Sequence, residues 1–382
     1  MSIAIYGGSF NPPHIGHRHV AEAVKKHLRP GRFFIIPAGE APHKTMAEGS
    51  PDSCERMEMC RRCFGDLGAE ISDMEIEREG KSYTVYTVRA LKETYPGEEI
   101  ILTMGTDMFL SLDTWREAEY LLQNVHICVV RRDEEKEAIR AKALEYAKTH
   151  HTRTTIIALR PVEASSSEIR EKLPQREGAE LLCDKVYEYI ISRRLYKARP
   201  NFEWLRCKAY SMLKPKRIPH VRGCEEEAVK LAQHWGEDTE EAAEAAILHD
   251  ITKRLNLREQ LLLCEKYGII PDALEGASEK LLHAKTGAAI SKECFGVSDK
   301  VYESIKWHTT GKADMSLLDK IIYMADYIEP TRDFEGVEAL RSLAYSDLDK
   351  AMVLGFNMSL EDLARYGVSP HPNTLEALAS LA

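Results

Sequence analysis

The stretch that decides the fold of the first half is SIAIYGGSFNPPHIGH, residues 2–17. Its opening apolar run is typical of a buried strand, which ends in two glycines and is followed by a helical pattern. Glycines at 7 and 8 let the backbone pass close to a ligand, and the first turn of a helix offers unpaired N–H groups to an anion. His14 and His17 are spaced to share one face of that turn. The stretch therefore predicts a phosphate-binding strand–loop–helix unit, although it lacks the Gly-Lys-Ser/Thr of a Walker loop.

Strand-like and helix-like segments alternate through the first half of the chain. The strand-like runs are residues 32–37, 99–104, 126–131 and 154–159, and the helical patterns include residues 84–95 and 134–148. This alternation predicts βα units that build a parallel sheet with both faces covered. We expect a Rossmann-like α/β domain.

The pattern changes after about Leu213, where helical periodicity continues without a convincing strand. The helical segments are residues 225–235, 239–249, 256–267, 281–295, 301–308 and 317–328. Between the halves lie KARP, a connecting helix near residues 202–212 and the Pro/Lys-rich LKPKRIPH. We predict an α/β domain over 1–198, a linker over 199–213 and an all-α domain over 214–382.

Composition narrows the class of protein. A chain of 382 residues is long enough for two domains, because single cores stop growing near ~250–300 residues. A formal net charge of −9 argues against a nucleic-acid partner. We find no signal-peptide pattern and no run near the ~18 apolar residues of a membrane helix, so we expect a cytoplasmic protein without a membrane partner. The sequence does not determine the oligomeric state and leaves a homodimer open.

Nine cysteines are scattered along the chain and are interpreted as reduced thiols. Cys60 and Cys63 form a CxxC, but no second pair or nearby histidine completes a zinc set. We therefore interpret them as two thiols on a helix face.

Several motifs of the first half carry a family resemblance. GGSFNPPHIGH is similar to the GxFxPxHxGH signature of the nucleotidylyltransferase superfamily, and ASSSEIR (164–170) is similar to its ISSSxIR loop. PAGEAPHK (37–44), SYTVYTV (82–88) and GTDMFLSLDTWRE (105–117) resemble segments of nicotinate mononucleotide adenylyltransferases. The sequence departs from the pattern at Tyr86, where that family usually has Asp.

The resemblance implies transfer of AMP from ATP, which brings Mg²⁺, to nicotinate mononucleotide, giving deamido-NAD and pyrophosphate. It implies catalytic roles for His14, His17, Lys44 and Arg170. It implies an ATP site of Gly7, Gly8, Ser9, Phe10, His14, His17, Gly105, Asp107, Arg132, Ser166, Ser167 and Arg170. It implies a nicotinate mononucleotide site of Lys44, Tyr83, Thr84 and Trp115. Because the attacking phosphate is already an anion, the histidines would act as donors to phosphate rather than as bases.

Histidines and aspartates interrupt the helical patterns of the second half. In chain order they are His220, His249, Asp250, His283, His308 and Asp326. The carboxylate of Asp326 is flanked by apolar residues on a predicted buried helix, where it is costly unless it is paired or binds a metal. Six such residues in order favour a shared site over isolated core or surface histidines.

This H…HD…H…H…D succession resembles the HD-domain metal-dependent phosphohydrolases. The phrases PHVRG, AAILHDITK, HAKTGA, WHTTG, MSLLDKIIYMADYIEPTR and HPNTLEAL are closest to the YqeK-type family, which hydrolyses diadenosine tetraphosphate symmetrically to two ADP. The resemblance implies two metal ions, iron or manganese, that share Asp250: one held with His220, His249 and Asp326, the other with His283 and His308. It implies phosphate contacts by Lys253, Thr309 and Arg332, and a catalytic role for Lys253 beside Asp250.

Other functions remain open at this point. The first domain could transfer AMP to pantetheine phosphate or another acceptor, and the second could cleave a different nucleotide. The second domain could also be an inactive regulatory or RNA-contacting module.

Overall fold

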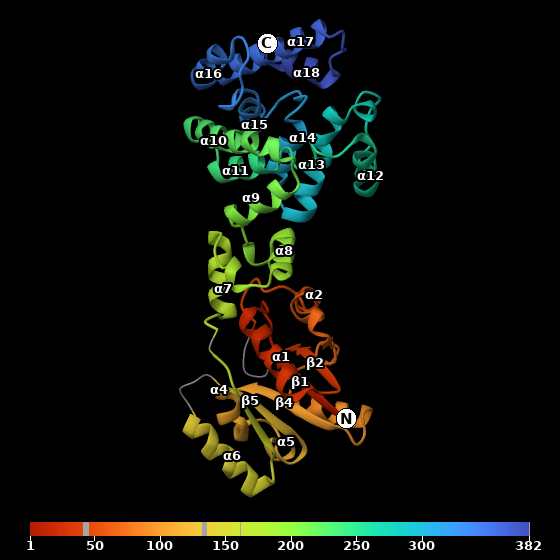
Figure 1. Ribbon diagram of the computed structural model, residues 1–382, viewed down its shortest axis with the longest axis vertical. Helices are drawn as coiled ribbons and strands as arrows, with labels where there is room; N and C mark the ends of the chain where they lie inside the picture. The colour runs from red at the N-terminus through yellow and green to blue at the C-terminus, as the bar shows by residue number, and fades with distance from the viewer. Residues whose placement is uncertain (41–45, 132–135, 161, 382) are drawn as a thin grey trace. The chain divides into compact units, whose positions relative to one another are not determined.

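The computed structural model describes residues 1–40, 46–131, 136–160 and 162–381 and divides the chain into two compact units, Met1–Arg199 and Pro200–Ala382 (Figure 1). The region predicted as a linker contains helix α9 (Phe202–Ser211). Leu205 and Ala209 of α9 belong to the apolar core of the second unit. The predicted domain limits themselves stay a prediction.

The first unit is built on a six-stranded sheet in the order β3-β2-β1-β4-β5-β6, in which every pair is parallel. The strands are β1 Ser2–Gly8, β2 Arg32–Pro37, β3 Glu70–Ile71, β4 Glu99–Gly105, β5 His126–Arg131 and β6 Thr154–Ala158. The predicted parallel α/β fold is confirmed, and five of the strands lie where the apolar runs place them. The two-residue β3 has too short an apolar pattern to be recognised.

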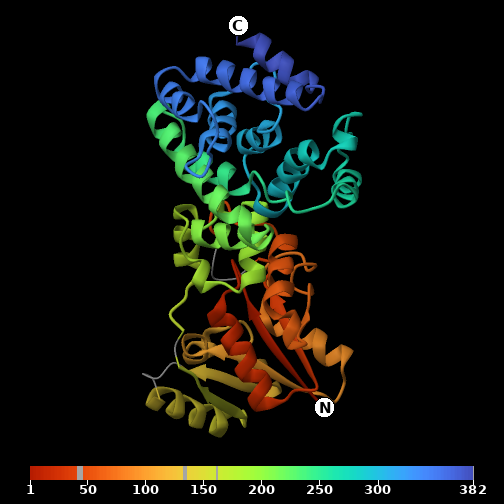
Figure 2. The same cartoon turned by 45° about the horizontal axis from the view of Figure 1, so that its top comes forward.

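Helices cover both faces of this sheet. The helices of this unit are α1 Ile15–Leu28, α2 Ser53–Phe64, α3 Thr84–Thr94, α4 Thr106–Leu110, α5 Ala118–Asn124, α6 Lys136–His150, α7 Ser166–Lys172 and α8 Asp184–Arg193. Buried residues of α3 to α6 form one core with alternate residues of the strands, among them Ile3, Phe34 and Leu102. Helices α1 and α2 pack against β6 and β2. Figure 2 shows the same sheet and its helices from a second direction.

The strand order reverses between β1 and β4, which lie side by side at the centre of the sheet. Chain connections leave these two strands in opposite directions, so their carboxyl ends leave an open crevice. The Gly7–Gly8 end of β1 and Gly105 at the end of β4 lie at this edge. The sheet therefore brings GGSFNPPHIGH and GTDMFLSLDTWRE together.

The second unit is all-helical among its described residues, as predicted. Besides α9, its helices are α10 Ile218–Trp235, α11 Thr239–Leu248, α12 Leu257–Tyr267, α13 Glu279–Phe295, α14 Asp299–Trp307, α15 Leu317–Ile328, α16 Val337–Ser346, α17 Leu348–Arg365 and α18 Pro372–Ser380. A single large apolar core joins them, with α15 buried at its centre. Over the described parts of the chain, we find no helix with the length and apolar character needed to cross a membrane.

Candidate active sites

The loop after β1 places the two N-terminal histidines at the start of α1. His14 is the N-cap residue of α1, and its backbone N–H donates to Nδ1 of His17 over 3.3 Å. Nδ1 of His17 is therefore an acceptor, so the hydrogen of the neutral ring lies on Nε2. The two rings lie 3.8 Å apart between centroids. This arrangement leaves an N–H donor at Nε2 of His17 beside the helix N-terminus.

Ser166 and Arg170 hold the backbone of this loop. The Oγ of Ser166 donates to the carbonyl of Pro12 over 2.8 Å, and Nη1 of Arg170 donates to the carbonyl of Asn11 over 2.6 Å. Nη2 of Arg170 also lies 3.2 Å from Oγ of Ser167. The second predicted motif thus lies against the first, and in this structure it anchors the loop.

Two further residues support the loop and carry no sequence signal that would have revealed them. Arg56 of α2 is buried, and its guanidinium donates to the carbonyls of Ser9 and Ala38 over 3.0 and 2.8 Å. The hydroxyl of Tyr196 donates to Oδ1 of Asn11 over 2.8 Å. Because these partners lie 18 to 185 residues apart in sequence, no local pattern predicts them.

Two cavities open at the carboxyl edge of the sheet and adjoin at Ser9, which lines both. The larger, of about 360 Å³, is lined by residues that include His14, His17, Gly105, Ser165, Ser166 and Ser167. The smaller, of about 170 Å³, is lined by residues that include Gly7, Gly8, Tyr83, Thr84, Trp115 and Arg116. The structure thus brings half of the predicted nucleotide residues to the larger cavity and most of the predicted acceptor residues to the smaller one.

The remaining predicted residues of the first unit lie elsewhere. Phe10 is fully buried beneath the loop and has a left-handed backbone (φ 45°). Asp107 is exposed in the first turn of α4 and is not among the described residues that line either cavity. Lys44 and Arg132 lie outside the described residues.

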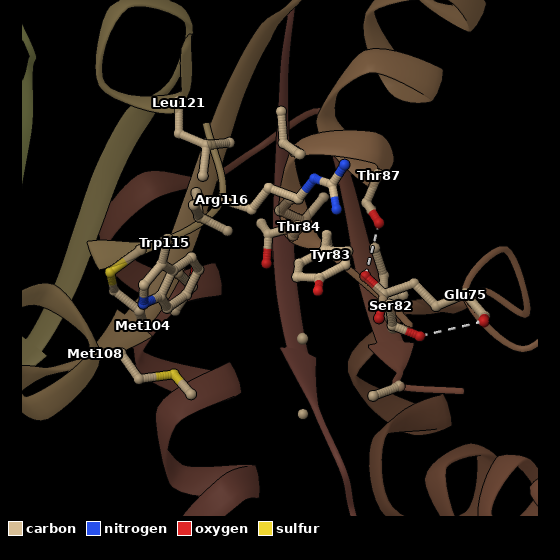
Figure 3. A pocket seen from close by; sticks show the side chains of 18 of the residues that line it. Glu75, Ser82, Tyr83, Thr84, Thr87, Met104, Met108, Trp115, Arg116 and Leu121 are labelled. Carbon is tan, nitrogen blue, oxygen red and sulfur yellow. Dashed lines mark hydrogen bonds between the residues drawn. The ribbon is translucent and has the colours of Figure 1, made fainter. Parts of the chain in front are cut away.

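The smaller cavity contains a cation that sequence reasoning missed. The guanidinium of Arg116 lies 4.8 Å from the ring centre of Tyr83 and 5.4 Å from that of Tyr86. In Figure 3, Arg116 reaches toward Tyr83, with Trp115 on the same side of the cavity and Glu75 on the other. Tyr86, the departure from the family pattern, thus serves as an aromatic face for Arg116.

The second unit gathers its predicted ligands around Asp250, which is fully buried at the turn after α11. One carboxylate oxygen, Oδ2, lies 3.5 Å from Nε2 of His249 and 3.9 Å from Nε2 of His220. The other, Oδ1, lies 3.1 and 3.8 Å from Nε2 of His283 and of His308. Nε2 of His220 lies a further 3.0 Å from Oδ1 of Asp326 on α15. Asp250 therefore presents Oδ2 to His220 and His249 and Oδ1 to His283 and His308.

Hydrogen bonds at Nδ1 orient three of these imidazoles. Nδ1 of His249 lies 2.7 Å from the carbonyl of Ala246, and Nδ1 of His308 lies 2.6 Å from the carbonyl of Ile305. Carbonyls accept hydrogen bonds only, so each Nδ1 carries the hydrogen and each Nε2 keeps its lone pair.

A buried carboxylate orients the ring of His220, which faces Oδ2 of Asp250 together with His249. Nδ1 of His220 lies 3.0 Å from Oε1 of Glu329. Glu329 is fully buried, and its other oxygen, Oε2, accepts from the backbone N–H of Thr331. Sequence reasoning did not single out Glu329, although it stands in the quoted phrase YIEPTR.

The donor set fits divalent metal ions. Among the residues that the structure describes, Nε2 of His249 and Oδ1 of Asp250 are buried without a hydrogen-bond partner. Ligand atoms of His249, Asp250 and His308 lie within 4.8 Å of one another, as do those of a second group that combines His220, Cys224, His249 and Asp326. Such buried, unsatisfied ligand atoms are costly unless a cation binds them.

The ionisation states of Asp250 and His283 agree with that fit. Burial opposes ionisation of Asp250, but the imidazoles around it, His249 first, hold its pKa well below the ordinary value. Burial and the ammonium of Lys253 lower the pKa of His283 to about 4, so its ring is neutral near pH 7. Burial and nearby carboxylates raise the pKa of the Cys224 thiol.

Cations surround the carboxylates of this site. Nε of Arg217 lies 2.5 Å from Oδ2 of Asp250, and Nη2 of Arg332 lies 2.8 Å from Oδ1 of Asp326. Nζ of Lys253 lies 3.0 Å from Nε2 of His283. Lys253 and Arg332 are two of the predicted phosphate contacts. The third, Thr309, has its Oγ1 buried without a hydrogen-bond partner among the described residues. Arg217, in the Pro/Lys-rich segment, was missed.

A third group of candidate ligands, Asp272, Glu275 and His371, lies apart from this centre. Nε2 of His371 lies 2.7 Å from Oδ2 of Asp272, and Glu275 accepts an ion pair from Lys285 over 2.6 Å. These contacts connect His371, the residue that caps α18, to the loop before α13.

Comparison with known proteins separates the same two halves. The cytidylyltransferase-like family matches residues 5–172, and the HD domain family matches residues 217–331. A probable nicotinate-nucleotide adenylyltransferase of Gemmatimonas aurantiaca is 33% identical over 205 residues, which cover 53% of this chain and 95% of that protein. A symmetrical bis(5'-nucleosyl)-tetraphosphatase of Halalkalibacterium halodurans is 39% identical over 175 residues, which cover 44% of this chain and 93% of that protein.

One relative matches both halves together. A protein of Mycoplasma genitalium named as a probable nicotinate-nucleotide adenylyltransferase/Ap4A hydrolase is 28% identical over 362 residues. The match covers 93% of this chain and 96% of the relative.

A substitution at Gly223, the last residue of PHVRG, tests the role of Glu329 in orienting His220. A Cβ at Gly223 would lie 2.4 Å from Oε2 of Glu329. We expect Gly223→Ala to displace this carboxylate, release Nδ1 of His220 and lower Mn²⁺ affinity about 10- to 100-fold, measured by calorimetric titration. The matched control is Gly276→Ala, because no atom lies within 4 Å of a Cβ there. Equal Mn²⁺ affinity in the two variants would contradict the assignment.

Proposed function

We propose two activities for this chain, which belongs in its first half to the family of nicotinate-nucleotide adenylyltransferases and in its second half to the family of symmetrical bis(5'-nucleosyl)-tetraphosphatases. The first unit transfers AMP from ATP to nicotinate mononucleotide and releases pyrophosphate and deamido-NAD. The second unit hydrolyses diadenosine tetraphosphate to two ADP. The relative that spans both halves under both names supports the combination.

The observation that carries the first activity is the pair of cavities that adjoin at Ser9. ATP in the larger cavity and nicotinate mononucleotide in the smaller would place the attacking phosphate beside the α-phosphate, in reach of an in-line displacement. The nucleophile is already an anion, so the reaction needs no general base. Nε2–H of His17 and the N-terminus of α1 offset the negative charge that builds on the phosphate oxygens, and Mg²⁺ arrives with ATP.

The observation that carries the second activity is Asp250, with one oxygen toward each half of a buried ligand set. We propose that His220, His249, Asp250 and Asp326 hold one ion and that Asp250, His283 and His308 hold another. Iron or manganese suits four imidazoles better than Mg²⁺. Such ions, when bound, polarise phosphate oxygens and activate water for attack on phosphorus.

The protein's own residues prepare this second site for a polyphosphate. Hydrogen bonds to Nδ1 keep the Nε2 lone pairs directed at the centre, and burial excludes bulk water. Arg217, Lys253 and Arg332 lie at the carboxylates and can turn to substrate phosphates once metal ions neutralise Asp250 and Asp326. An acidic chain with a complete ligand set argues against an RNA-binding module, and hydrolysis of another nucleotide remains the alternative.

The first prediction separates the two sites. We expect His17→Ala to lower kcat for deamido-NAD synthesis about 10²- to 10³-fold, because a donor to the reacting phosphate is lost, and to leave tetraphosphate hydrolysis unchanged. Asp250→Asn should abolish hydrolysis and leave synthesis unchanged. Both rates are measured on the same preparations. His27→Ala, at the end of α1, and Asp299→Asn, an exposed surface position, are matched controls. Loss of both activities from either change would refute independent sites.

The second prediction concerns the choice of acceptor. A guanidinium braced by two tyrosine rings in the smaller cavity suits the carboxylate of nicotinate better than the uncharged amide of nicotinamide. Arg116→Met should lower kcat/KM for nicotinate mononucleotide roughly 10-fold or more, with little change for nicotinamide mononucleotide. Arg89→Met, which removes a guanidinium paired with Glu117 outside the cavity, is the control. An equal loss of kcat/KM for both acceptors would show that Arg116 does not recognise the nicotinate carboxylate.

The third prediction concerns metal. The purified full chain should contain iron or manganese by elemental analysis, and chelation should abolish hydrolysis but spare the fold of the first unit. Metal that binds only the native state should also raise the unfolding midpoint of the second unit. Protein that neither contains nor takes up these metals would instead favour a regulatory module.

A further inference from the structure

The CxxC of the first unit has its partner elsewhere. Cys60 and Cys63 are both fully buried on α2. Sγ of Cys63 lies 3.6 Å from Sγ of Cys183, 120 residues further along the chain. Cys183 is the N-cap residue of α8, which packs against α2. Cys63 and Cys183 are therefore the two cysteines that lie close enough to react with each other. Cys60 is near Cys63 in the sequence but is not part of this pair.

The two thiols differ in access and in charge. Cys183 is half-buried at a helix N-terminus, where the backbone dipole favours an anion, whereas Cys63 is inaccessible. The hydrogen bond with Cys63 and the nearby guanidinium of Arg18 lower the pKa of Cys183. The same hydrogen bond and burial raise the pKa of Cys63. The hydrogen bond joins Cys63 to the more exposed sulfur, and either sulfur can be its donor.

We propose that Cys183 and Cys63 form a reversible thiol–disulfide exchange site for low-molecular-weight disulfides such as oxidised glutathione. The Cys183 thiolate attacks one sulfur of glutathione disulfide, forms a mixed disulfide and releases one glutathione thiolate. Cys63 then loses its proton to that thiolate or to solvent and attacks the Cys183 sulfur. The second glutathione leaves, so two protein thiols are oxidised while one glutathione disulfide is reduced to two glutathione molecules.

The disulfide would join two supports of the GGSFNPPH loop. Helix α2 carries Arg56, which donates to the carbonyl of Ser9, and the segment after α8 carries Tyr196, which donates to Asn11. A covalent bond between α2 and α8 restricts the unfolded chain over a long loop. Oxidation should therefore raise the unfolding midpoint of the first unit by several degrees, while that of the second unit stays constant.

The experiment uses the full chain with the three exposed cysteines, Cys54, Cys207 and Cys294, replaced by serine. After incubation with oxidised glutathione, intact mass should fall by two hydrogens, and a peptide pair joining Cys63 to Cys183 should appear and vanish with a reductant. With Cys63→Ser added, the reaction should stop at one glutathione bound to Cys183. With Cys183→Ser added, neither product should form, because Cys63 is buried. Cys60→Ser is the matched control and should keep the disulfide.

Three results would overturn the proposal: loss of the disulfide in Cys60→Ser, absence of the glutathione adduct in Cys63→Ser, or an adduct on Cys183 that never resolves when Cys63 is present. Circular dichroism of each variant shows whether it is folded. None of these readouts depends on either proposed activity.

Discussion

The hydrogen bonds at Nδ1 of His17, His220, His249 and His308 decide what these imidazoles present to the two sites. A neutral histidine has one N–H and one lone pair, so the partner of Nδ1 decides what Nε2 presents. Nδ1 of His17 accepts a backbone N–H, which leaves Nε2 as a donor suited to phosphate. Nδ1 of His249 and of His308 face carbonyls, which leaves Nε2 with a lone pair suited to a metal ion. The imidazole side chain thus presents a donor at His17 and a lone pair at His249 and His308, according to the backbone group that faces Nδ1.

That placement comes from helix ends. The N-cap position of α1 provides a backbone N–H with no intrahelical acceptor, and His17 accepts it. The C-terminal turns of α11 and α14 provide the carbonyls of Ala246 and Ile305, and the histidine that follows each helix binds its carbonyl through Nδ1. Backbone groups at the helix ends therefore orient these three rings.

Much of the fold follows from local patterns, and the site follows in part. Apolar runs identify five strands because strands buried on both faces are continuously apolar. Residues such as His249 and Asp250 stand out because polar groups are rare within buried helices. Arg56 and Arg116 could not be identified in this way. An arginine has no periodic signature, and these two act through carbonyls and rings brought near by the tertiary fold. Glu329 was hidden for the same reason, since its partner His220 lies 109 residues away.

Gly39 and Gly223 belong to motifs that the sequence reveals, but the physical reason for a glycine at each position becomes clear only in the structure. In sequence, the glycines of PAGE and PHVRG are typical of turns. In the structure neither has the left-handed backbone that would require glycine, and both are needed for space. A Cβ at Gly39 would lie 2.3 Å from the carbonyl oxygen of Glu75 at the wall of the smaller cavity, and a Cβ at Gly223 would clash with Oε2 of Glu329. Each glycine lets a residue outside its own motif approach a functional group. The motifs thus record contacts between distant segments, which a single sequence cannot reveal on its own.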